Sequence, residues 1–576
     1  MSLHLKISYG SRLLAVLCVL AASSAFAQTE PAVLLQPAAL DTTGTYSLRR
    51  IEPALTGKGV TIAAVCRSLT YIDGKPQGDY RLNIDHACFG SRDIHFADTL
   101  HNAGVSFHST AIGGILVGND PAGFHPDTGE FYYEGAAPEA RVDVYEFWRF
   151  VSLYVFGRKD FKADILTMSV GSVFDDWWTR GIEHLADTQG ILIFAGIGNG
   201  TEVHDPVFYP GAGANIIGVG VVDSLKTDLV ADSLERFSLP RPEHSSRGPT
   251  PDDRCKPDIV APGNCLVPSA ESNTGYDVSG DWSSFATPVV AGTAALIWQK
   301  AASDPALALA IAQKGGNCVM KAILMNSATK LPYWHKGRPT KDDDHLAILD
   351  YQQGAGMLNA VGAYQQLLAG RAAPGTVAPQ GWDNNVLEKK PGLEHIYAFE
   401  VPEPAGQVFT GTLVWNRHFQ NEFPFSPLTE ADSDLTLELW AVDPENPDRT
   451  RLLDYSDSIN DNVEHIWCPL DPKCTRYEIV VTFSEIAGDI EKYPSEQYGL
   501  AWRTAAADDR QNTFWHDLDL DGDIDTDDLI LLMSRFAESD TANVGFGPGD
   551  LDMSGRIDTE DLNSFIIRLQ QVRTIN

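Results

Sequence analysis

Hydrophobic and polar positions follow an α/β pattern between residues 58 and 372. Short, mainly apolar runs are separated by stretches with helical periodicity, and these runs lie at residues 60–65, 140–145, 163–169 and 191–195. Such runs are typical of parallel strands that are buried on both faces. Because strands and helices alternate, we predict an α/β domain whose parallel sheet is covered by helices on both faces.

The pattern changes after residues 371–379, a predicted linker rich in Pro, Gly and Ala. Beyond it, short segments of alternating polarity are separated by turn residues, at 395–401, 409–415, 435–440 and 477–483. This alternation is typical of strands with one buried face. We therefore predict a β-sandwich over residues 381–504.

The N-terminus has the features of a signal peptide. Lys6 and Arg12 precede the apolar run 13–22, and Ala25-Phe26-Ala27 is a small-x-small cleavage site. We expect cleavage after Ala27, which assigns residues 1–27 to the signal peptide and places the mature protein outside the cell or in the periplasm. The apolar run is too short to span a bilayer, and no later stretch reaches spanning length. Residues 28–57 are predicted to be a short leader without clear periodicity.

Charge and cysteine content narrow the classes of partner. The 576-residue chain has a formal net charge of −35, which argues against nucleic acid and suits an exported or calcium-binding protein. Seven cysteines follow the signal peptide, and export permits disulfides. Cys255 with Cys265, and Cys468 with Cys474, are the plausible local pairs, although spacing does not fix connectivity.

Residues 279–292 carry the first candidate chemistry. They place Ser284 directly ahead of the apolar run 289–298. Proline is tolerated in the first turn of a helix, so Pro288 predicts that Ser284 lies at a helix N-terminus. Free backbone N–H groups there favour developing negative charge, as an acyl-transfer nucleophile requires. The alternative is a buried serine that caps an ordinary core helix.

Five sequence blocks stand out between residues 57 and 372, at 107–114, 168–171, 198–200 with 209–211, 245–249 with 256–263, and 283–288. In their content and order these blocks resemble those of subtilases, the subtilisin-like serine peptidases. The resemblance implies an endopeptidase acting on protein or peptide substrates, with Ser284 as nucleophile, His108 as base and Asn199 as oxyanion donor.

The chain departs from the family where the histidine should be oriented by an aspartate. Cys66 occupies that position, followed by Arg67 and Ser68, and Trp282 stands where glycine is usual. Three interpretations of Cys66 are open. Another acid could reach His108, the candidates being Asp73, Asp85 and Asp98. Cys66 could be a thiolate beside a histidinium. In the third interpretation the site is catalytically weak or inactive, and Cys66 is a buried apolar residue or a disulfide partner of Cys88. The protein would then be a pseudopeptidase that binds polypeptide.

The second predicted domain resembles the jelly-roll domain that follows the catalytic domain in some secreted subtilases. The likeness rests on three short stretches, at 412–415, 432–435 and 460–464. Stability, substrate docking and carbohydrate contact are all open as its role.

Two acidic loops 33 residues apart carry the second candidate chemistry. Each has calcium-loop spacing, with Gly at position 6 and oxygen ligands around it. The expected ligands are Asp517, Asp519, Asp521, Asp523, Asp525 and Asp528 in the first loop, and Asp550, Asp552, Ser554, Arg556, Asp558 and Asp561 in the second.

The duplicated loops resemble a dockerin module, which docks onto cohesins. Position 12 is Asp in both loops, and no clear helix enters either loop. Ser554 weakens the second site. Residues 513–576 contain fourteen acidic residues and four arginines, a net charge of −10. Without calcium this self-repulsion should loosen the module.

Overall fold

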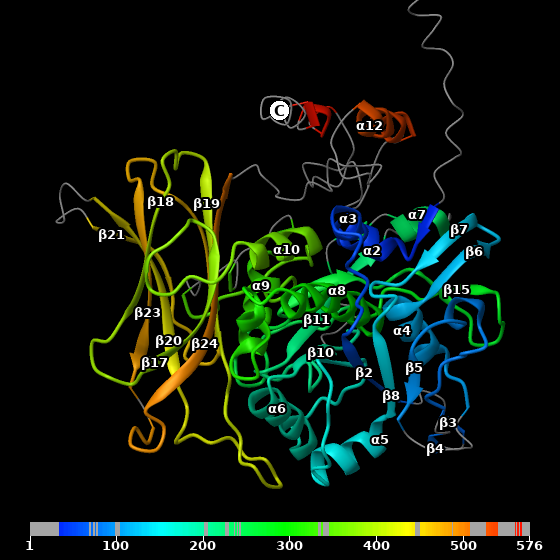
Figure 1. The fold of residues 1–576 in the computed structure, drawn as a ribbon, viewed down its shortest axis with the longest axis horizontal. Coiled ribbons are helices and arrows are strands. Elements are labelled where there is room, and N and C mark those ends of the chain that lie inside the picture. Colours follow the sequence, from blue (N-terminus) through cyan, green and yellow to red (C-terminus); the bar gives the residue numbers. More distant parts are fainter. Residues whose placement is uncertain are drawn as a thin grey trace, which may run out of the picture.

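The computed structural model shows an α/β domain beside a domain of two sheets, with helix α12 apart from both (Figure 1). The residues it describes are 34–67, 71–72, 75–76, 79–97, 104–200, 206–224, 230–235, 237–238, 240, 244–331, 334, 336–337, 345–443, 450–486, 488–506, 526–538, 559, 561–563 and 565–566.

The core of the first domain is the predicted parallel sheet. Its strand order is β12-β11-β10-β9-β2-β8-β5, with β13 pairing to β11. All pairs are parallel except β11 with β12. The strand bounds are β2 Thr61–Cys66, β5 Ile94–Phe96, β8 Arg141–Glu146, β9 Ile165–Met168, β10 Leu192–Gly196, β11 Ile217–Ser224, β12 Phe237–Ser238 and β13 Ile259–Pro262.

Helices cover both faces of this sheet, as the sequence predicts. Successive side chains of a strand point to opposite faces. In β2, Ile62, Ala64 and Cys66 belong to one core, while Ala63 and Val65 belong to the other. The helices are α4 Phe107–Val117, α8 Ser283–Ser303, α9 Gly316–Asn326 and α10 Ala360–Leu368 on the first side, and α5 Phe147–Phe150, the π-helix η2 Val151–Phe156 and α6 Trp177–Gln189 on the second.

The leader predicted over residues 28–57 needs correction in the part that the structure describes. Residues 34–51 form β1 Leu34–Gln36, α2 Ala38–Thr42 and α3 Thr45–Ile51. Leu40 and Leu48 are fully buried in the main core, and the Thr45 and Thr293 hydroxyls are hydrogen-bonded at 2.8 Å. These elements are too short to show periodicity, and long-range contacts hold them in place.

The second domain contains two sheets that enclose a common core. The sheets have the strand orders β16-β18-β23-β20-β21 and β17-β24-β19-β22. Their bounds are β16 Gly375–Thr376, β17 Gly381–Glu388, β18 His395–Glu400, β19 Gln407–Trp415, β20 Asp434–Val442, β21 Arg451–Ser456, β22 Val463–Pro469, β23 Arg476–Glu485 and β24 Ser495–Ala506. We call this unit the two-sheet domain.

The two domains share a continuous core. Trp382, Val414, Val463 and Ala501 of the two-sheet domain belong to the same buried cluster as α9. The Thr412 hydroxyl donates to Asn326 Oδ1 at 3.1 Å across the junction. A side chain at Gly499 of β24 would come within 2.4 Å of the Val319 backbone nitrogen, so the close approach of strand and helix requires glycine there.

The remaining described elements are short or peripheral. They are β3 Tyr71–Ile72, β4 Lys75–Pro76, η1 Ala87–Phe89, β6 Asn119–His125, β7 Gly129–Glu134, α7 Val230–Glu235, β14 Leu266–Pro268, β15 Tyr276–Val278, η3 Ala308–Ile311 and α12 Thr526–Glu538.

All seven cysteines after the signal peptide are free thiols, so the disulfides considered from sequence do not form in this structure. Cys255 Sγ contacts the Leu349 carbonyl, and Cys265 Sγ contacts the Gly263 carbonyl and the Ser279 hydroxyl. Within the described residues, no helix combines the length and apolar character needed to cross a membrane.

Candidate active site

A cavity of about 180 Å³ lies at the carboxyl edge of the parallel sheet. This is the edge at which open α/β sheets bind ligands. Its lining includes residues that follow β2, β9 and β10 and residues from the first turns of α4 and α8. The residues with candidate chemistry are Arg67, His108, Asn199, Ser283 and Ser284. The structure therefore brings together the three residues predicted to act in catalysis.

Ser284 is the second residue of α8, as expected for a serine at a helix N-terminus. Pro288, however, lies in the second turn rather than the first. A proline there cannot donate to the carbonyl four residues earlier, which belongs to Ser284. The Ser169 hydroxyl donates to this Ser284 carbonyl at 2.7 Å. The hydroxyl of Ser169, the residue directly after β9, thus replaces the N–H that Pro288 lacks and holds the start of α8 in place. The four-residue spacing of Ser284 and Pro288 is the feature of the sequence that predicts this missing helical hydrogen bond.

The orientation of the Asn199 side chain is fixed by Ser283. Its Oδ1 accepts hydrogen bonds from the Ser283 backbone N–H at 2.9 Å and from the Ser283 hydroxyl at 2.8 Å. A backbone N–H can only donate, so the amide atom facing it is the oxygen. The Nδ2 group therefore remains to donate to an oxyanion formed beside Ser284.

The turn that carries Asn199 is shaped by glycine and by Ser246. Gly198 has a φ of +109°, which favours glycine. The Ser246 backbone N–H donates to the Gly198 carbonyl at 3.2 Å, and the Ser246 hydroxyl accepts from Gly200 N–H at 3.2 Å. The block at residues 245–249 therefore positions the oxyanion donor.

His108 is a deeply buried, neutral imidazole. It is the second residue of α4, whose N-terminus is capped by the Ser106 side chain. Only 3% of its surface is exposed, and neither ring nitrogen has a hydrogen-bond partner among the residues that the structure describes. Burial lowers the pKa of His108 to about 4. The ring is therefore a free base near neutral pH, the form that can accept a proton from Ser284.

Cys66 lies at the end of β2 as a protonated, buried thiol. Burial raises its pKa to about 12, and a hydrogen bond with Ser109 offsets this only in part. Burial thus disfavours a thiolate beside a histidinium, because it favours the neutral forms of both the Cys66 thiol and the His108 imidazole. Cys66 is also not bonded to Cys88.

The alternative acids receive no support in the described part of the chain. Asp85 lies in an exposed turn, and no described carboxylate is hydrogen-bonded to His108. Asp73 and Asp98 lie outside the described residues. The position that should steady the base therefore holds an uncharged side chain.

Two further departures lie at the cavity. Trp282 is 45% exposed and stacks on Phe285, with ring centroids 6.0 Å apart. The Arg67 guanidinium lies 5.7 Å from the Phe147 ring centroid and 5.9 Å from that of Trp148. Sequence reasoning noted both residues and assigned a role to neither.

Three potential metal-ligating residues meet near the start of α8. Asp223, His244 and Asp281 have ligand atoms within 4.8 Å of one another. His244 Nδ1 lies 2.8 Å from Asp223 Oδ2, and Asp281 accepts from the Ser224 backbone and hydroxyl at 2.7 Å each. These bonds tie the end of β11 to the segment before Ser284.

The block at residues 256–263 has a structural role. The Asp258 carboxylate forms ion pairs with Lys256 and Lys321, and all three side chains are almost completely buried. The same carboxylate accepts from Gly218 N–H at 2.7 Å. This cluster joins β11, β13 and α9 behind the site.

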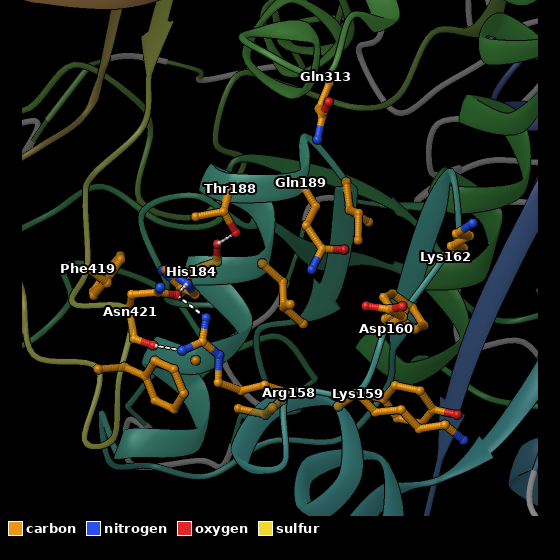
Figure 2. Close-up of a pocket in the computed structure, with 18 of the residues that line it drawn as sticks. Arg158, Lys159, Asp160, Lys162, His184, Thr188, Gln189, Gln313, Phe419 and Asn421 are labelled. Carbon is orange, nitrogen blue, oxygen red and sulfur yellow. Dashed lines mark hydrogen bonds between the residues drawn. The ribbon is translucent and has the colours of Figure 1, made fainter.

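A larger cavity, of about 1050 Å³, lies at the opposite, amino edge of the sheet (Figure 2). It is bounded by residues 158–164, α6 and a loop of the two-sheet domain. Asn421 from that loop is bonded to the Arg158 guanidinium and to His184 Nε2, the latter at 3.1 Å. These bonds latch the loop onto the first domain, away from Ser284.

The three candidate catalytic residues His108, Asn199 and Ser284 lie in a part of the chain that matches a known protein family. Residues 91–356 match the model of the subtilase family. The matched range contains His108, Asn199 and Ser284, whereas Cys66 and Arg67 precede it.

Two curated relatives are proteases. The chain is 28% identical over 283 residues to serine protease AprX from Bacillus subtilis (strain 168), which covers 43% of this chain and 58% of AprX. It is 29% identical over 200 residues to subtilisin-like protease SBT6.1 from Arabidopsis thaliana, which covers 33% and 17% of the two chains. The match therefore spans less than two thirds of either relative.

Among solved structures, the patellamide maturation protease PatA matches 54% of this chain and 98% of its own, at 22% identity and a TM-score of 0.37. The prenylagaramide maturation protease PagA matches 56% and 98%, at 19% identity and a TM-score of 0.38. The family-model match and the curated relatives support assignment of residues 91–356 to the subtilase family.

Proposed function

We propose that the protein is a serine endopeptidase that cleaves polypeptides through Ser284, His108 and Asn199. One observation carries the proposal: Ser283 fixes the Asn199 amide so that its Nδ2 is free to donate beside Ser284. A serine that only capped a core helix would not need an oriented amide and a buried base in the same cavity.

The proposed reaction uses the groups in their present protonation states. Neutral His108 accepts the Ser284 hydroxyl proton while Oγ attacks the scissile carbonyl. Asn199 Nδ2 and the Ser284 backbone N–H donate to the oxyanion. The resulting imidazolium returns its proton to the leaving amine, and water then hydrolyses the acyl-enzyme.

The missing acid sets an expected rate penalty. The imidazolium would form at a site that is 3% exposed, where burial favours the neutral thiol of Cys66 and no carboxylate of the described residues is hydrogen-bonded to His108. Loss of this acid alone costs about 3 × 10⁴ in turnover in a subtilisin. We therefore expect slow hydrolysis of peptides and readier reaction with activated electrophiles.

A serine-directed fluorophosphonate probe tests the proposal. The full-length, calcium-loaded protein should be labelled, and Ser284→Ala should not be. Labelling should also fall strongly in His108→Ala. Absence of labelling in the wild-type protein, after correct processing, would contradict the proposal.

A pseudopeptidase that binds polypeptide without turnover is the second candidate. It is favoured by the two unpartnered ring nitrogens of His108. Catalytic hydrogen bonds often form only in the substrate complex, so this observation does not outweigh the assembled site. Tight binding of a peptide by a protein that the probe does not label would favour this candidate.

We further propose export and calcium binding for this chain. Cleavage after Ala27 would place the protein outside the cell or in the periplasm, and N-terminal sequencing of the mature protein tests this.

Residues 513–576 would bind calcium through the paired loops, most of which lies outside the described residues. Asp528 and Asp561, the last position of each loop, are both fully buried. Closely spaced carboxylate oxygens suit a hard cation such as calcium.

Calcium would order a module that docks onto a cohesin-type partner. Limited proteolysis should release residues 513–576 in the presence of a chelator but not with excess calcium. A cohesin domain should bind the calcium-loaded chain and not a chain truncated after residue 506. Identical proteolysis with and without the chelator would contradict the calcium proposal.

A further inference from the structure

Three aromatic rings form a row beside His108 and Ser284. Phe285, directly after Ser284 in α8, is completely buried. Its ring centroid lies 5.7 Å from that of His108. The same distance is 6.2 Å to Phe107 and 6.0 Å to Trp282. Phe107 is 37% exposed and Trp282 is 45% exposed, so both ends of this aromatic row reach the surface.

Trp282 is placed by its backbone and by stacking. It is the N-cap residue of α8 and lines the cavity that contains Ser284. Its backbone packs on Gly263, where a side chain would come within 2.6 Å of the Trp282 carbonyl oxygen. The indole lies at 15° to the Phe285 ring, so one face of the indole packs against Phe285 and the accessible surface belongs to its other face and edges. A ring that is already packed in this way loses little entropy when a ligand binds to it.

The aromatic row lies on the side of the site where the leaving amine must be. In hydrolysis by a serine nucleophile, the base returns its proton to the leaving nitrogen. That nitrogen must therefore lie next to His108, and it belongs to the residue that follows the cleaved bond. Because His108 contacts Phe285, the central ring of the row, the side chain of that residue is placed beside the row.

We propose that Trp282 is a specificity determinant that selects polypeptides with an aromatic or large aliphatic residue directly after the bond attacked by Ser284. The proposal rests on the proposed peptidase function of this cavity. An apolar side chain that packs on the exposed indole removes apolar surface of both partners from water. Glycine, the usual residue at this position in subtilases, has no such surface, so the preference would be a property of this chain.

Acyl transfer to amines tests this side of the site alone. An activated ester acylates Ser284, and the acyl-enzyme then reacts either with water or with an added amino acid amide. When the amide reacts, its amine forms the new peptide bond, the ester bond to Ser284 Oγ breaks, and the amine proton passes through His108 to Oγ. This step is the reverse of acylation by a peptide, so the acceptor occupies the place of the leaving amine.

The measured quantity is the ratio of aminolysis to hydrolysis for each acceptor at equal concentration of free amine, with the full-length, calcium-loaded protein. Phenylalanine and leucine amides should give a ratio about fivefold to thirtyfold higher than glycine amide, because an exposed ring buries only part of the acceptor side chain. A ratio does not depend on the overall rate, so the test suits a slow enzyme.

Variants assign the preference to the indole. The preference should fall to within about twofold in Trp282→Ala and persist in Trp282→Phe, which keeps an aromatic ring. Trp467→Ala is the matched control, because Trp467 is 39% exposed and lies on β22 of the two-sheet domain. Circular dichroism of each variant establishes that it is folded.

The outcomes separate this inference from the proposed function. Equal ratios for phenylalanine and glycine amides would overturn the inference, as would a preference that survives in folded Trp282→Ala. If the fluorophosphonate probe labels Ser284 and no acceptor preference exists, only the inference fails.

If the probe does not label Ser284, the peptidase proposal fails and peptide binding to Ser284→Ala decides the role of Trp282. Fluorescence anisotropy should then show tighter binding of a peptide that contains Phe than of its Gly counterpart, and the difference should disappear in Ser284→Ala/Trp282→Ala. Equal binding of the two peptides to Ser284→Ala would overturn the inference as well.

Discussion

The chemistry of His108 depends on where its charge goes after proton transfer. A neutral imidazole is the correct starting form for a general base, and deep burial provides it. The same burial penalises the imidazolium that must form next, because a buried charge without a partner is costly. Here the Asn199 amide is oriented by Ser283, whereas none of the described carboxylates is hydrogen-bonded to His108.

Restoring that partner should accelerate the reaction. Cys66→Asp places a carboxylate at the acid position of the family, where it would stabilise the imidazolium. We expect kcat to rise by about 10²–10⁴, measured with a quenched-fluorescence peptide. Cys66→Asn is the matched control, since it has the same shape without the charge. Equal rates for the Asp and Asn variants would show that another group already serves as the acid.

The pH dependence of activity should reflect the buried imidazole. Burial lowers the pKa of His108 to about 4, so kcat/KM should be level above about pH 5 and fall with the uptake of one proton below pH 4. Cys66→Asp should move this acid limb to higher pH, because a nearby carboxylate favours the imidazolium. An acid limb near pH 6.5 in the wild-type protein would mean that the ring is solvated or already paired.

At the scale of elements, the start of α8 depends on a strand far away in the sequence. Pro288 deprives the Ser284 carbonyl of its helical donor, and the Ser169 hydroxyl replaces it. Ser169 follows β9, so its hydrogen bond joins the sheet to α8 at Ser284. A buried carbonyl left without a donor costs about 1–3 kcal/mol.

A double-mutant cycle tests this compensation. Ser169→Ala should lower the free energy of unfolding by about 1–3 kcal/mol, measured by urea denaturation. In Ser169→Ala/Pro288→Ala the loss should be smaller, because the residue at 288 regains an N–H that can bond to the Ser284 carbonyl. Ser172→Ala, three residues after Ser169, should change stability by less than about 0.5 kcal/mol. Simple additivity of the two substitutions would contradict the argument.

Local patterns predicted much of the α/β framework. The apolar run 60–65 became β2 at Thr61–Cys66, and the run 191–195 became β10 at Leu192–Gly196. Each apolar run is long enough to indicate a strand buried on both faces. This indication does not depend on knowing which strands lie beside it. Patterns alone did not predict that Ser284, His108 and Asn199 would meet, because more than eighty residues separate neighbouring members; the resemblance to subtilases supplied that.

The features that sequence missed are set by distant contacts. Pro288 can lie in the second turn because the Ser169 hydroxyl donates to the Ser284 carbonyl. The rule that restricts proline to the first turn considers one helix alone and does not include such a donor from elsewhere in the chain. Residues 34–51 appear featureless because contacts such as Thr45 with Thr293, rather than periodicity, stabilise them. The protonation state of Cys66 follows from complete burial, which a single sequence position does not reveal.

At the scale of the whole molecule, charged and polar groups join the two domains. His418 of the two-sheet domain contacts Asp187 on α6 at 3.0 Å and Glu496 on β24 at 3.2 Å. Burial opposes a charge on His418, but hydrogen bonds to both carboxylates raise its pKa to about 10. Asn421, which is hydrogen-bonded to Arg158 and His184, lies on the same loop as His418. Several bonds therefore hold this loop against the first domain.

Stability should therefore depend on the charge of His418. The pKa of this group is higher in the folded state than its usual value of about 6.5, so the folded state binds the extra proton between pH 6.5 and 10. Its contribution is complete below pH 6.5 and is lost as the pH rises through 10. His418→Gln should lower the unfolding free energy by about 2–4 kcal/mol at pH 6, because it leaves two carboxylates without their cation.

Denaturation at several pH values checks this prediction. The difference between wild type and His418→Gln should shrink as the pH approaches 10. His95→Gln is the control, because His95 pairs with Asp93 at the surface and should matter by less than about 1 kcal/mol. A difference that does not vary with pH would assign the effect to packing rather than to charge.

The shared core at α9 has a consequence for the order in which the protein can fold. Gly499 packs against the backbone of Val319, and Ala501 completes the same buried cluster. A ribosome must add about 180 residues after α9 before those strand residues exist, which takes roughly 10–35 s at ordinary elongation rates. Until then the surface of α9 that packs against Gly499 and Ala501 is covered by its own chain only in part, through earlier residues such as Trp382 and Val414. The core around α9 is therefore complete only after the second domain has been synthesised.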